Sequence, residues 1–293
     1  MESTATLAKR YRITNGRTFH LKNSDPADTW KLKSKEQAAK ALAAGVERLA
    51  ELQERLYAQD NWSVLLIFQA MDAAGKDSTI KHVMSGVNPQ GCEVYSFKAP
   101  TSTELDHDFL WRCTRCLPER GRIGIFNRSY YEETLVVRVH PEFLAGQKVP
   151  RSLITKNIWR ERFEDINGLE KYASRNGIAV RKFFLHVSKE EQKRRFLSRL
   201  DEPEKNWKFS STDVQERQHW DDYMDAYEET IRNTATPHAP WYVVPADHKW
   251  FTRLVVAEAV IETLESLDLR YPAISDSMRK ELAAARKKLM SQK

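Results

Sequence analysis

The segment SVLLIFQAMDAAGKDSTIKHV, residues 63–83, decides how this chain is expected to fold. Residues 63–69 form a short apolar run rich in branched side chains, which is typical of a strand buried on both faces of a parallel sheet. Residues 70–75 are small and acidic, and a helical spacing of apolar residues from Ile80 to Val87 follows. This order of strand, small-residue turn, Gly-Lys pair and helix predicts a phosphate-binding loop, in which backbone N–H groups and a lysine face an anion.

The predicted loop supplies the first candidate site residues. Lys76 would contact a phosphate, because a lysine at the start of a helix is otherwise disfavoured by the helix dipole. Asp72 and Asp77 flank it, and two carboxylates beside a phosphate suit Mg²⁺. Further candidates for phosphate contact are Ala73, Ala74, Gly75, Ser78 and Thr79.

An alternative interpretation of this segment stays open. The match to the usual phosphate-loop pattern is incomplete, since Ala70 stands where glycine is common and Asp77 where a hydroxyl is common. The segment could then be an ordinary buried strand and a capped helix with an exposed lysine. Asp77 would in that case stabilise the helix N-terminus.

Four further predicted strands alternate with predicted helices along the rest of the chain. We predict strands at 92–98, 122–127, 179–187 and 241–245, and helices at 34–57, 100–117, 150–176, 189–200, 213–233 and 251–267. Alternation of strands and helices predicts a three-layer α/β fold whose central parallel sheet has right-handed crossovers. Ligands should bind at the carboxyl ends of its strands.

The domain organisation follows from the same pattern. Residues 1–33 are polar and predict a mostly irregular arm on the surface. Residues 34–272 form one phosphate-binding domain, and residues 273–293 form a charged C-terminal helix.

A second group of candidates follows the strand at 122–127. Asn127 stands where phosphate-loop enzymes often carry a magnesium-binding aspartate, so it can orient water but brings no charge. Arg128 suits charge-assisted contacts with phosphates. Glu132 would position an acceptor or a second metal ion. A solvated helix face is the alternative for Glu132 and Glu133, and we expect it for one of the two.

A third group lies at 189–212, where a helix leads into a polar loop. Residues 193–200 contain four cations and no acid, which is typical of the basic lid of small kinases, although a solvated helix face is the alternative. Phe196 and Leu200 are expected to anchor the helix to the core. The lid candidates are Lys193, Arg194, Arg195, Arg199 and Lys208.

Composition narrows the class of protein. The chain has 293 residues, a net charge of +6 and a mean hydropathy of −0.63, which suits a polyanionic partner without identifying one. No apolar run approaches the ~18 residues of a membrane span, and no apolar signal segment begins the chain, so we expect a cytoplasmic protein with no membrane partner. The sequence has no basic stripe interleaved with aromatic residues, so we expect no nucleic-acid partner. Cys113 and Cys116 lack a second pair, so a metal or redox role is not expected.

Six stretches make the sequence resemble the polyphosphate kinase 2 family over about residues 15–270. The stretches are MDAAGKDSTIKHV at 71–83, NPQGCEVYSFKAP at 88–100, ELDHDFLWR at 104–112, GRIGIFNRSYYEE at 121–133, VVRVHPE at 136–142 and APWYVVPADHKWF at 239–251. The FNRSYYEE stretch is similar to the class III subgroup, which is associated with phosphorylating nucleoside mono- and diphosphates.

The resemblance implies a thymidylate-kinase-like fold and a polyphosphate:AMP/ADP phosphotransferase that forms ADP and ATP. It places Lys76 and Arg128 on the phosphates, Asp72 and Asp77 around Mg²⁺, with Mn²⁺ as an alternative, and Glu132 near the acceptor phosphate or its metal. Guanine nucleotides are a further acceptor option, and we expect a homo-oligomer. Direct in-line transfer needs positioning and charge neutralisation more than covalent help. Two alternatives are an ATP-dependent nucleotide or nucleoside kinase of this fold and a non-catalytic polyanion-binding protein.

Overall fold

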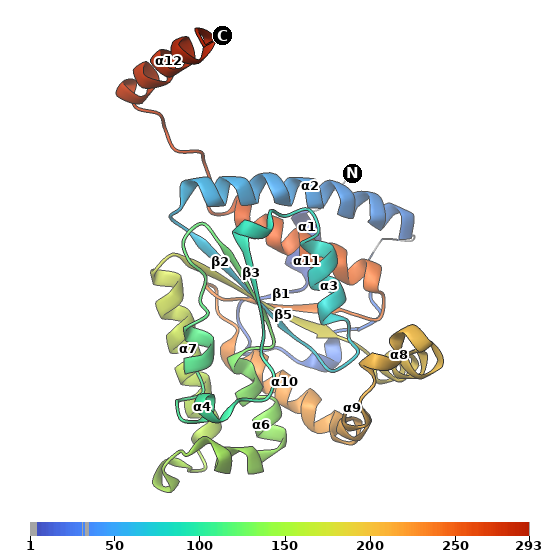
Figure 1. The fold of residues 1–293 in the computed structure, drawn as a ribbon. Helices are drawn as coiled ribbons and strands as arrows, with labels where there is room; N and C mark the ends of the chain where they lie inside the picture. Colours follow the sequence, from blue (N-terminus) through green and yellow to red (C-terminus); the bar gives the residue numbers. More distant parts are fainter. Residues whose placement is uncertain (1–4, 31, 33–34, 293) are drawn as a thin grey trace.

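A single sheet organises the fold of the computed structural model, which describes residues 5–30, 32 and 35–292. The strand order is β1-β6-β5-β2-β4-β3 (Figure 1). Strands β2 to β6 run parallel, whereas β1 pairs antiparallel with β6. The bounds are Arg12–Ile13 for β1, Ser63–Gln69 for β2, Cys92–Ser96 for β3, Ile123–Asn127 for β4, Ile178–His186 for β5 and Trp241–Pro245 for β6. The five predicted strands are confirmed, and β1 adds an antiparallel edge.

Strand β2 lies at the centre of the sheet, which explains its apolar sequence. All seven of its residues are buried, and it pairs with β4 on one side and β5 on the other. The chain leaves β2 for β3 and β4 on one side and later returns to β5 and β6 on the other. Such a switch point opens a crevice at the carboxyl end of the central strand, and the predicted phosphate loop begins there.

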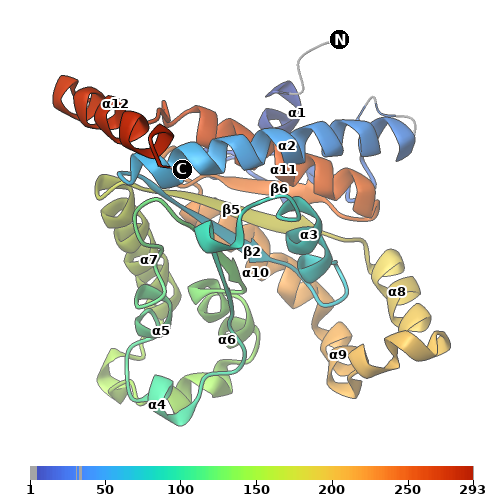
Figure 2. The ribbon, with the colours of Figure 1, turned by 45° about the horizontal axis from the view of Figure 1, so that its top comes forward.

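Helices cover both faces of the sheet, so the predicted three layers are confirmed. Helices α2, Lys35–Gln59, α3, Lys76–Val83, and α11, Lys249–Glu265, lie on one face (Figures 1 and 2). Helices α7, Ile158–Arg175, and α10, Trp220–Thr234, lie on the other. Twelve of the seventeen α11 residues are buried, because α11 is packed between the sheet and α2.

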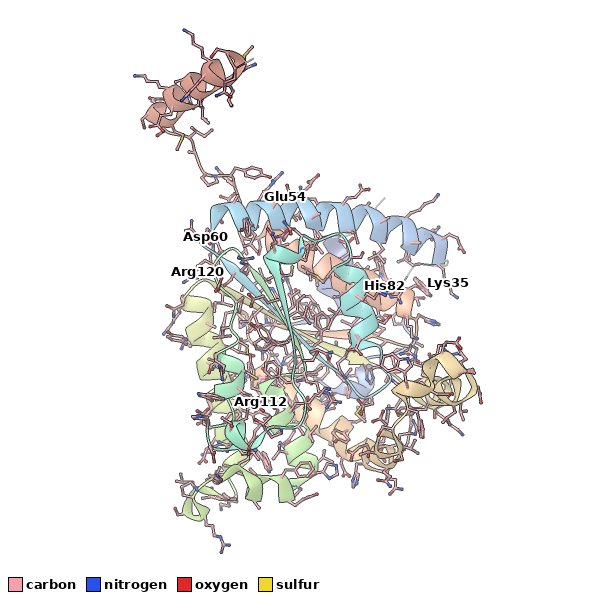
Figure 3. The ribbon with its side chains drawn as sticks, in the orientation of Figure 1. Lys35, Glu54, Asp60, His82, Arg112 and Arg120 are labelled. Carbon is pink, nitrogen blue, oxygen red and sulfur yellow. The ribbon has the colours of Figure 1, made fainter. Side chains whose placement is uncertain are left out.

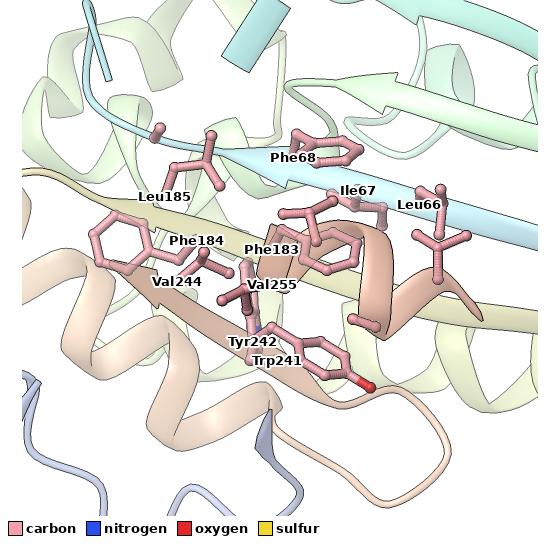
Figure 4. Close-up of a cluster of buried hydrophobic side chains, with 14 of the residues drawn as sticks. Leu66, Ile67, Phe68, Phe183, Phe184, Leu185, Trp241, Tyr242, Val244 and Val255 are labelled. Carbon is pink, nitrogen blue, oxygen red and sulfur yellow. The ribbon is translucent and has the colours of Figure 1, made fainter. Parts of the chain in front are cut away.

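Aromatic side chains from neighbouring strands fill the centre of the core (Figure 4). Phe68 of β2 stacks on Phe183 of β5 with ring centroids 4.9 Å apart, and Phe183 stacks on Tyr242 of β6 at 5.2 Å. Parallel strands in register place these rings side by side on one face of the sheet. The stack ties the central strand β2 to β5, which precedes the lid in sequence, and to β6, which follows it.

The N-terminal segment is more integrated than the predicted surface arm. Helix α1, Ala5–Arg10, and β1 lie in it, and Leu7 and Ala8 are at most 2% exposed. Tyr11 packs edge-on against Phe251 of α11. The widely spaced apolar residues of a polar stretch are buried here because they reach the sheet edge, which periodicity within the segment does not reveal.

Three predicted helices are shorter or broken. The helix at 100–117 is replaced by α4, Ser102–Leu105, and α5, Trp111–Thr114, because the Asp108 side chain accepts from the Leu110 N–H and caps a new turn. The helix at 150–176 begins only at Ile158, since Thr155 Oγ1 accepts from the Asn157 N–H in a local turn. Before it lie α6, Val136–Val139, and 3₁₀ segments at Pro141–Gln147 and Arg151–Leu153.

The lid region contains several short helices. Helix α8 is Lys189–Asp201, followed by a 3₁₀ segment at Pro203–Lys208 and α9, Ser211–Glu216. A 3₁₀ turn, Arg217–His219, then separates α9 from α10, so the predicted continuous helix at 213–233 is interrupted. Helix α12, Asp276–Met290, confirms the predicted C-terminal helix and stands apart from the domain (Figure 1). Within the described residues no helix is both long and apolar enough to span a membrane.

Candidate active site

The loop between β2 and α3 has the tight backbone turns that its sequence predicts. Gly75 precedes α3 with φ of 107°, a left-handed conformation that favours glycine, and Ala73 also has a positive φ of 62°. The Lys76 ammonium folds back over the loop and donates to the Ala70 carbonyl at 2.8 Å. Burial and the nearby Arg128 charge lower the pKa of Lys76, and the surrounding carboxylates oppose them. A cation held in this way gains from a bound anion.

Arg195 of α8 fixes the shape of this loop from behind. It is 6% exposed, and its guanidinium donates to the carbonyls of Ala73 at 3.1 Å and Ala74 at 2.7 Å. It also donates to Ala246 and Asp247, which follow β6, and to Glu191. All donor groups of an arginine are thus used within the protein. The predicted lid cation Arg195 is therefore a buried clamp between two loops, because its position on α8 faces inward.

A second contact joins α8 to the loop. Gln192 is 1% exposed, and its amide donates to the Asp72 carbonyl at 3.0 Å. Arg217, beyond α9, donates to the Gln192 side-chain oxygen at 2.5 Å and to the Lys189 carbonyl at 3.0 Å. The helix that bears the lid cations is therefore tied to the phosphate loop at both of these residues, Gln192 and Arg195.

A cleft of about 690 Å³, which we call the basic cleft, opens in front of the loop. Its lining includes Asp72, Ala73, Gly75, Asp77, Ser78 and Asn127 from the predicted site, and only three acidic residues in all. Against these acids stand eight cations, namely Lys76, Lys98, Arg128, Arg194, Arg195, Arg199, Lys205 and Lys249. A surplus of cations in one concave surface attracts polyanions.

Mutual repulsion among these cations is visible at Lys249. Burial lowers the pKa of its ammonium, and the nearby Arg195 and Lys205 charges lower it further. An anion in the basic cleft would relieve this cost. Lys98 and Lys249 were missed by the sequence reasoning. Lys98 ends a predicted strand and Lys249 follows another, so their position at the carboxyl edge of the sheet was a usable signal.

Some of the other predicted site residues do not line the basic cleft. Ala74 and Thr79 are buried and do not line it, and Lys193 is exposed on the outer side of α8. Arg194 lines the cleft while donating to Glu191, and Arg199 lines it while pairing with Asp213 at 3.3 Å. The Lys208 side chain lies outside the described residues.

The lid is anchored by one of the two predicted residues. Phe196 is 5% exposed and packs inward, whereas Leu200 is 48% exposed. Position 200 lies near the end of α8, beyond the last turn that reaches the domain, so its apolar character does not indicate burial.

The two loop carboxylates are oriented by the last residue of β4 and the residue that follows it. Arg128 donates to Asp72 at 3.0 Å, and the Asn127 amide donates to Asp77 at 2.6 Å. No set of three or more His, Cys, Asp or Glu side chains in the described residues is arranged to hold a metal ion, because the third predicted ligand, Glu132, lines a different pocket. A pair of carboxylates fits Mg²⁺, which commonly takes one or two of them and completes its octahedron with water and phosphate oxygens.

Arg128 and Glu132 lie where the basic cleft meets a second pocket, and we call this place the junction. Arg128 has a left-handed backbone with φ of 65°, and its guanidinium lies 3.6 Å from the Glu132 carboxylate. Strained backbone at a non-glycine residue is common in functional sites. The Gln69 amide, oriented to satisfy both of its ends, donates to Glu132 at 2.8 Å. Burial raises the pKa of Glu132, and Arg128 opposes this shift.

A buried ion pair supports this junction from below. Lys182 of β5 lies 2.6 Å from Glu170 of α7, and both side chains are at most 1% exposed. The hydroxyls of Tyr130 and Tyr131 donate to Glu170 at 3.0 and 2.7 Å, respectively. Because these tyrosines directly precede Glu132 in sequence, the pair fixes the segment that carries Arg128 and Glu132. The sequence reasoning missed this network, since Lys182 sits inside a strand that reads as apolar.

A second pocket, of about 440 Å³, adjoins the basic cleft and shares Lys98, Ala99 and Arg128 with it. Arg112 of α5, labelled in Figure 3, lines it and donates to the Lys98 carbonyl at 2.8 Å. Apolar lining comes from Leu105, Phe109, Val136, Val137 and Phe143, and acidic lining from Glu104, Asp108, Glu132, Glu133 and Glu142. The second pocket is therefore acidic and partly apolar, unlike the cleft beside it.

The expectation that one of Glu132 and Glu133 is solvated is wrong. Glu133 is 4% exposed and accepts from Arg162 at 2.9 Å and from the Gln147 amide at 2.6 Å. Glu132 has a side chain that is 18% exposed and turns toward Arg128. The short 3₁₀ segment Tyr130–Glu133 has no free helix face, so both carboxylates point toward the protein.

Fold and site together define a P-loop kinase-like phosphotransferase of the α/β class. Residues 31–272 match the family described as Polyphosphate kinase 2 (PPK2), and the chain belongs to this family. It is 54% identical over 284 residues to an ADP-polyphosphate phosphotransferase of Rhodopseudomonas palustris, covering 96% of this chain and 98% of that protein. It is 45% identical over 265 residues to an AMP/ADP-polyphosphate phosphotransferase of Meiothermus ruber, covering 90% and 95%.

A solved structure agrees with the fold. The crystal structure of Polyphosphate Kinase 2 from Arthrobacter aurescens TC1 superimposes with a TM-score of 0.88 at 39% identity, covering 96% of both chains. The resemblance inferred from six sequence stretches is thereby confirmed.

Proposed function

We propose that this protein transfers the terminal phosphoryl group of inorganic polyphosphate to AMP and ADP. The observation that carries the proposal is the meeting of two unlike pockets at Arg128. The basic cleft suits a chain of phosphates, whereas the second pocket offers apolar and acidic groups to a nucleoside. A phosphoryl group passing between the two pockets must pass Arg128.

Lys76 and Arg128 neutralise charge on the transferring group in this proposal. Transfer between phosphates proceeds in line and relies on positioning and electrostatics, so no covalent intermediate is needed. The Lys76 ammonium is held by the Ala70 carbonyl, and Arg128 is held by Asp72. Both cations are therefore preorganised, which lowers the reorganisation cost at the transition state.

Asp72 and Asp77 are the residues that would hold Mg²⁺ in the basic cleft. The ion would supply charge neutralisation on phosphate oxygens. Asn127 orients Asp77 through its amide, and Arg128 orients Asp72. The asparagine that ends β4 thus acts by positioning the Asp77 carboxylate.

Glu132 is assigned to the acceptor side. It lines the second pocket and faces Arg128, so it lies where the phosphate of a bound nucleotide meets the junction. A carboxylate repels a phosphate unless a cation bridges them, and a monophosphate, which is the shorter acceptor, depends most on such a bridge. We assign Phe109 and Phe143, which are apolar, to contacts with the nucleoside.

The test is an assay of purified protein with polyphosphate, Mg²⁺ and either AMP or ADP, in the absence of ATP, with products separated by chromatography. We expect ADP from AMP and ATP from ADP, and GMP or GDP in place of adenine nucleotides tests the guanine option. Activity that requires ATP as donor would identify an ATP-dependent kinase instead. Polyphosphate binding without turnover, with Mn²⁺ as well as Mg²⁺, would leave only a binding protein.

A further inference from the structure

Among the α-helices that the structure describes, α12 is the one whose residues are all seen to be exposed. It follows an extended segment and stands apart from the domain (Figures 1 and 3). An isolated helix of this length is marginally stable in water, because few residues share the cost of nucleation. A packing partner would therefore be needed to keep it folded.

The apolar residues of α12 have the spacing of a coiled coil. Met278, Leu282, Ala285 and Leu289 follow one another at intervals of four, three and four residues. These are the alternating d and a positions of two heptads, and they form one stripe along the helix. Met278, Leu282 and Leu289 are 46%, 52% and 66% exposed, so the stripe, which we call the α12 seam, is uncovered.

The charges beside the α12 seam indicate which partner fits. Glu281 and Arg286 lie on opposite flanks, at g and e positions, five residues apart. In a parallel pair of identical helices, the g residue of one helix meets the e residue of the next heptad on the other, so each Glu281 meets an Arg286. No ion pair within the described residues involves Glu281 or Arg286, so both are available to such a partner.

An antiparallel pair fits less well. It would gain contacts between Glu281 and Lys288 but would place Arg279 against Arg286 of the other copy, and like charges there are destabilising. We therefore propose that α12 pairs in parallel, through the α12 seam, with α12 of a second copy of this chain. A twofold axis along the pair makes the two contacts identical. Because the seam spans only two heptads, the pairing is weak on its own and depends on protein concentration.

Cross-linking of the whole chain tests the register. In a parallel, in-register pair each seam residue faces its own counterpart, which brings two cysteines there within disulfide reach. The Ala285→Cys variant should therefore form a disulfide-linked dimer about tenfold faster than the Ala284→Cys variant, whose new side chain lies outside the seam. Unmodified protein measures the background from Cys92, Cys113 and Cys116. Equal rates for both variants would overturn the proposal.

Charge exchange in the Ala285→Cys background gives a second test. Either Glu281→Arg or Arg286→Glu alone should slow cross-linking several-fold, and the two together should restore it. A double variant as slow as either single variant would overturn the parallel register. Because α12 lies outside the domain, the thermal midpoint of the domain and its turnover should stay unchanged in all these variants, which excludes misfolding as a cause.

Discussion

The basic cleft and the second pocket share a wall but differ in almost every property. The cleft is larger, carries eight cations against three acids, and is bounded by the backbone of the phosphate loop. The second pocket carries five acids against three cations and has an apolar floor from Phe109, Phe143 and neighbouring side chains. The difference teaches that one site is built for an extended polyanion and the other for a molecule with both an apolar and a charged end.

The two regions also differ in how they are held in place. The cleft is fixed by the buried Arg195 and Gln192, which bond to loop carbonyls. The second pocket is assembled from short helices and 3₁₀ turns, α4 to α6, tied by side-chain contacts such as that between Glu133 and Arg162. Substitutions in the two regions should therefore differ in which substrate they affect and in how much they change the free energy of unfolding.

Lys76→Ala should have the largest effect. It removes the cation nearest the phosphate loop, so turnover with both AMP and ADP should fall by about two to three orders of magnitude. Thermal unfolding should change little, because the Lys76 ammonium donates one hydrogen bond to a described residue, the Ala70 carbonyl. Lys193→Ala is the matched control, since Lys193 is exposed outside the cleft and should leave turnover unchanged. A folded Lys76→Ala protein with near-normal turnover would contradict the assignment of the loop.

Glu132→Gln should separate the two acceptors. We expect kcat/KM for AMP to fall by about a hundredfold and that for ADP by about tenfold, because misplacement costs the shorter nucleotide more. The measurement is kcat/KM for each acceptor at fixed Mg²⁺ and polyphosphate. Equal losses would make Glu132 a general structural or metal residue.

The pH profile gives an independent readout of Glu132. Burial raises the pKa of this carboxyl, so its ionised form, and with it AMP phosphorylation, is lost as pH falls through that raised pKa. The folded state then binds the proton more readily than the unfolded state, so the same fall in pH stabilises the fold through this group. The acid limb should disappear in Glu132→Gln, and a limb that persists unchanged would belong to another group.

Arg195→Gln and Arg199→Gln should differ from each other within one helix. Arg195 is buried with all its donors paired, so its loss leaves several carbonyls and Glu191 without partners and should destabilise the fold by about 2–4 kcal/mol. Activity should fall with it, since the phosphate loop loses its clamp. Arg199→Gln should instead lower turnover by about tenfold with little change in stability. Chemical denaturation measures the free energy of unfolding of each variant, and polyphosphate kinetics measure its turnover. Equal unfolding free energies for the two variants would contradict the role of Arg195 as a clamp.

Phe143→Ala should have the smallest effect and the narrowest one. Phe143 is 51% exposed beside the second pocket, so its removal should raise the KM for AMP and ADP by about fivefold through lost apolar contact. The KM for polyphosphate should not move. Phe209→Ala, on the lid and outside both pockets, is the control. An increase in the polyphosphate KM would mean that the two pockets are not divided as proposed.

The sequence by itself determined the central sheet and most of the phosphate site. The apolar run at 63–69 needs helices on both faces of the sheet to cover it. The short Gly-Lys turn that follows must then lie at the carboxyl end of this strand, where ligands bind. Two neighbouring parallel strands, β2 and β4, are closely followed in sequence by Asp72, Lys76, Asp77 and Arg128. The pairing of these strands was therefore enough to bring the four residues together. The described part of the predicted arm was misjudged because β1 and Tyr11 are held by contacts with the distant β6 and α11. The helix at 100–117 was misjudged because a local turn at Asp108 interrupts it.

Only the tertiary structure decided which charged residues face a ligand and which face the protein. Arg195 and Arg199 share the same chemistry and one helix, yet only Arg195 reaches the carbonyls after β2 and β6. Lys182 and Glu170 are buried as a pair, which neither sequence segment reveals alone. The physical reason is that a charge is buried only where partners from distant segments satisfy it, and the fold alone sets those distances.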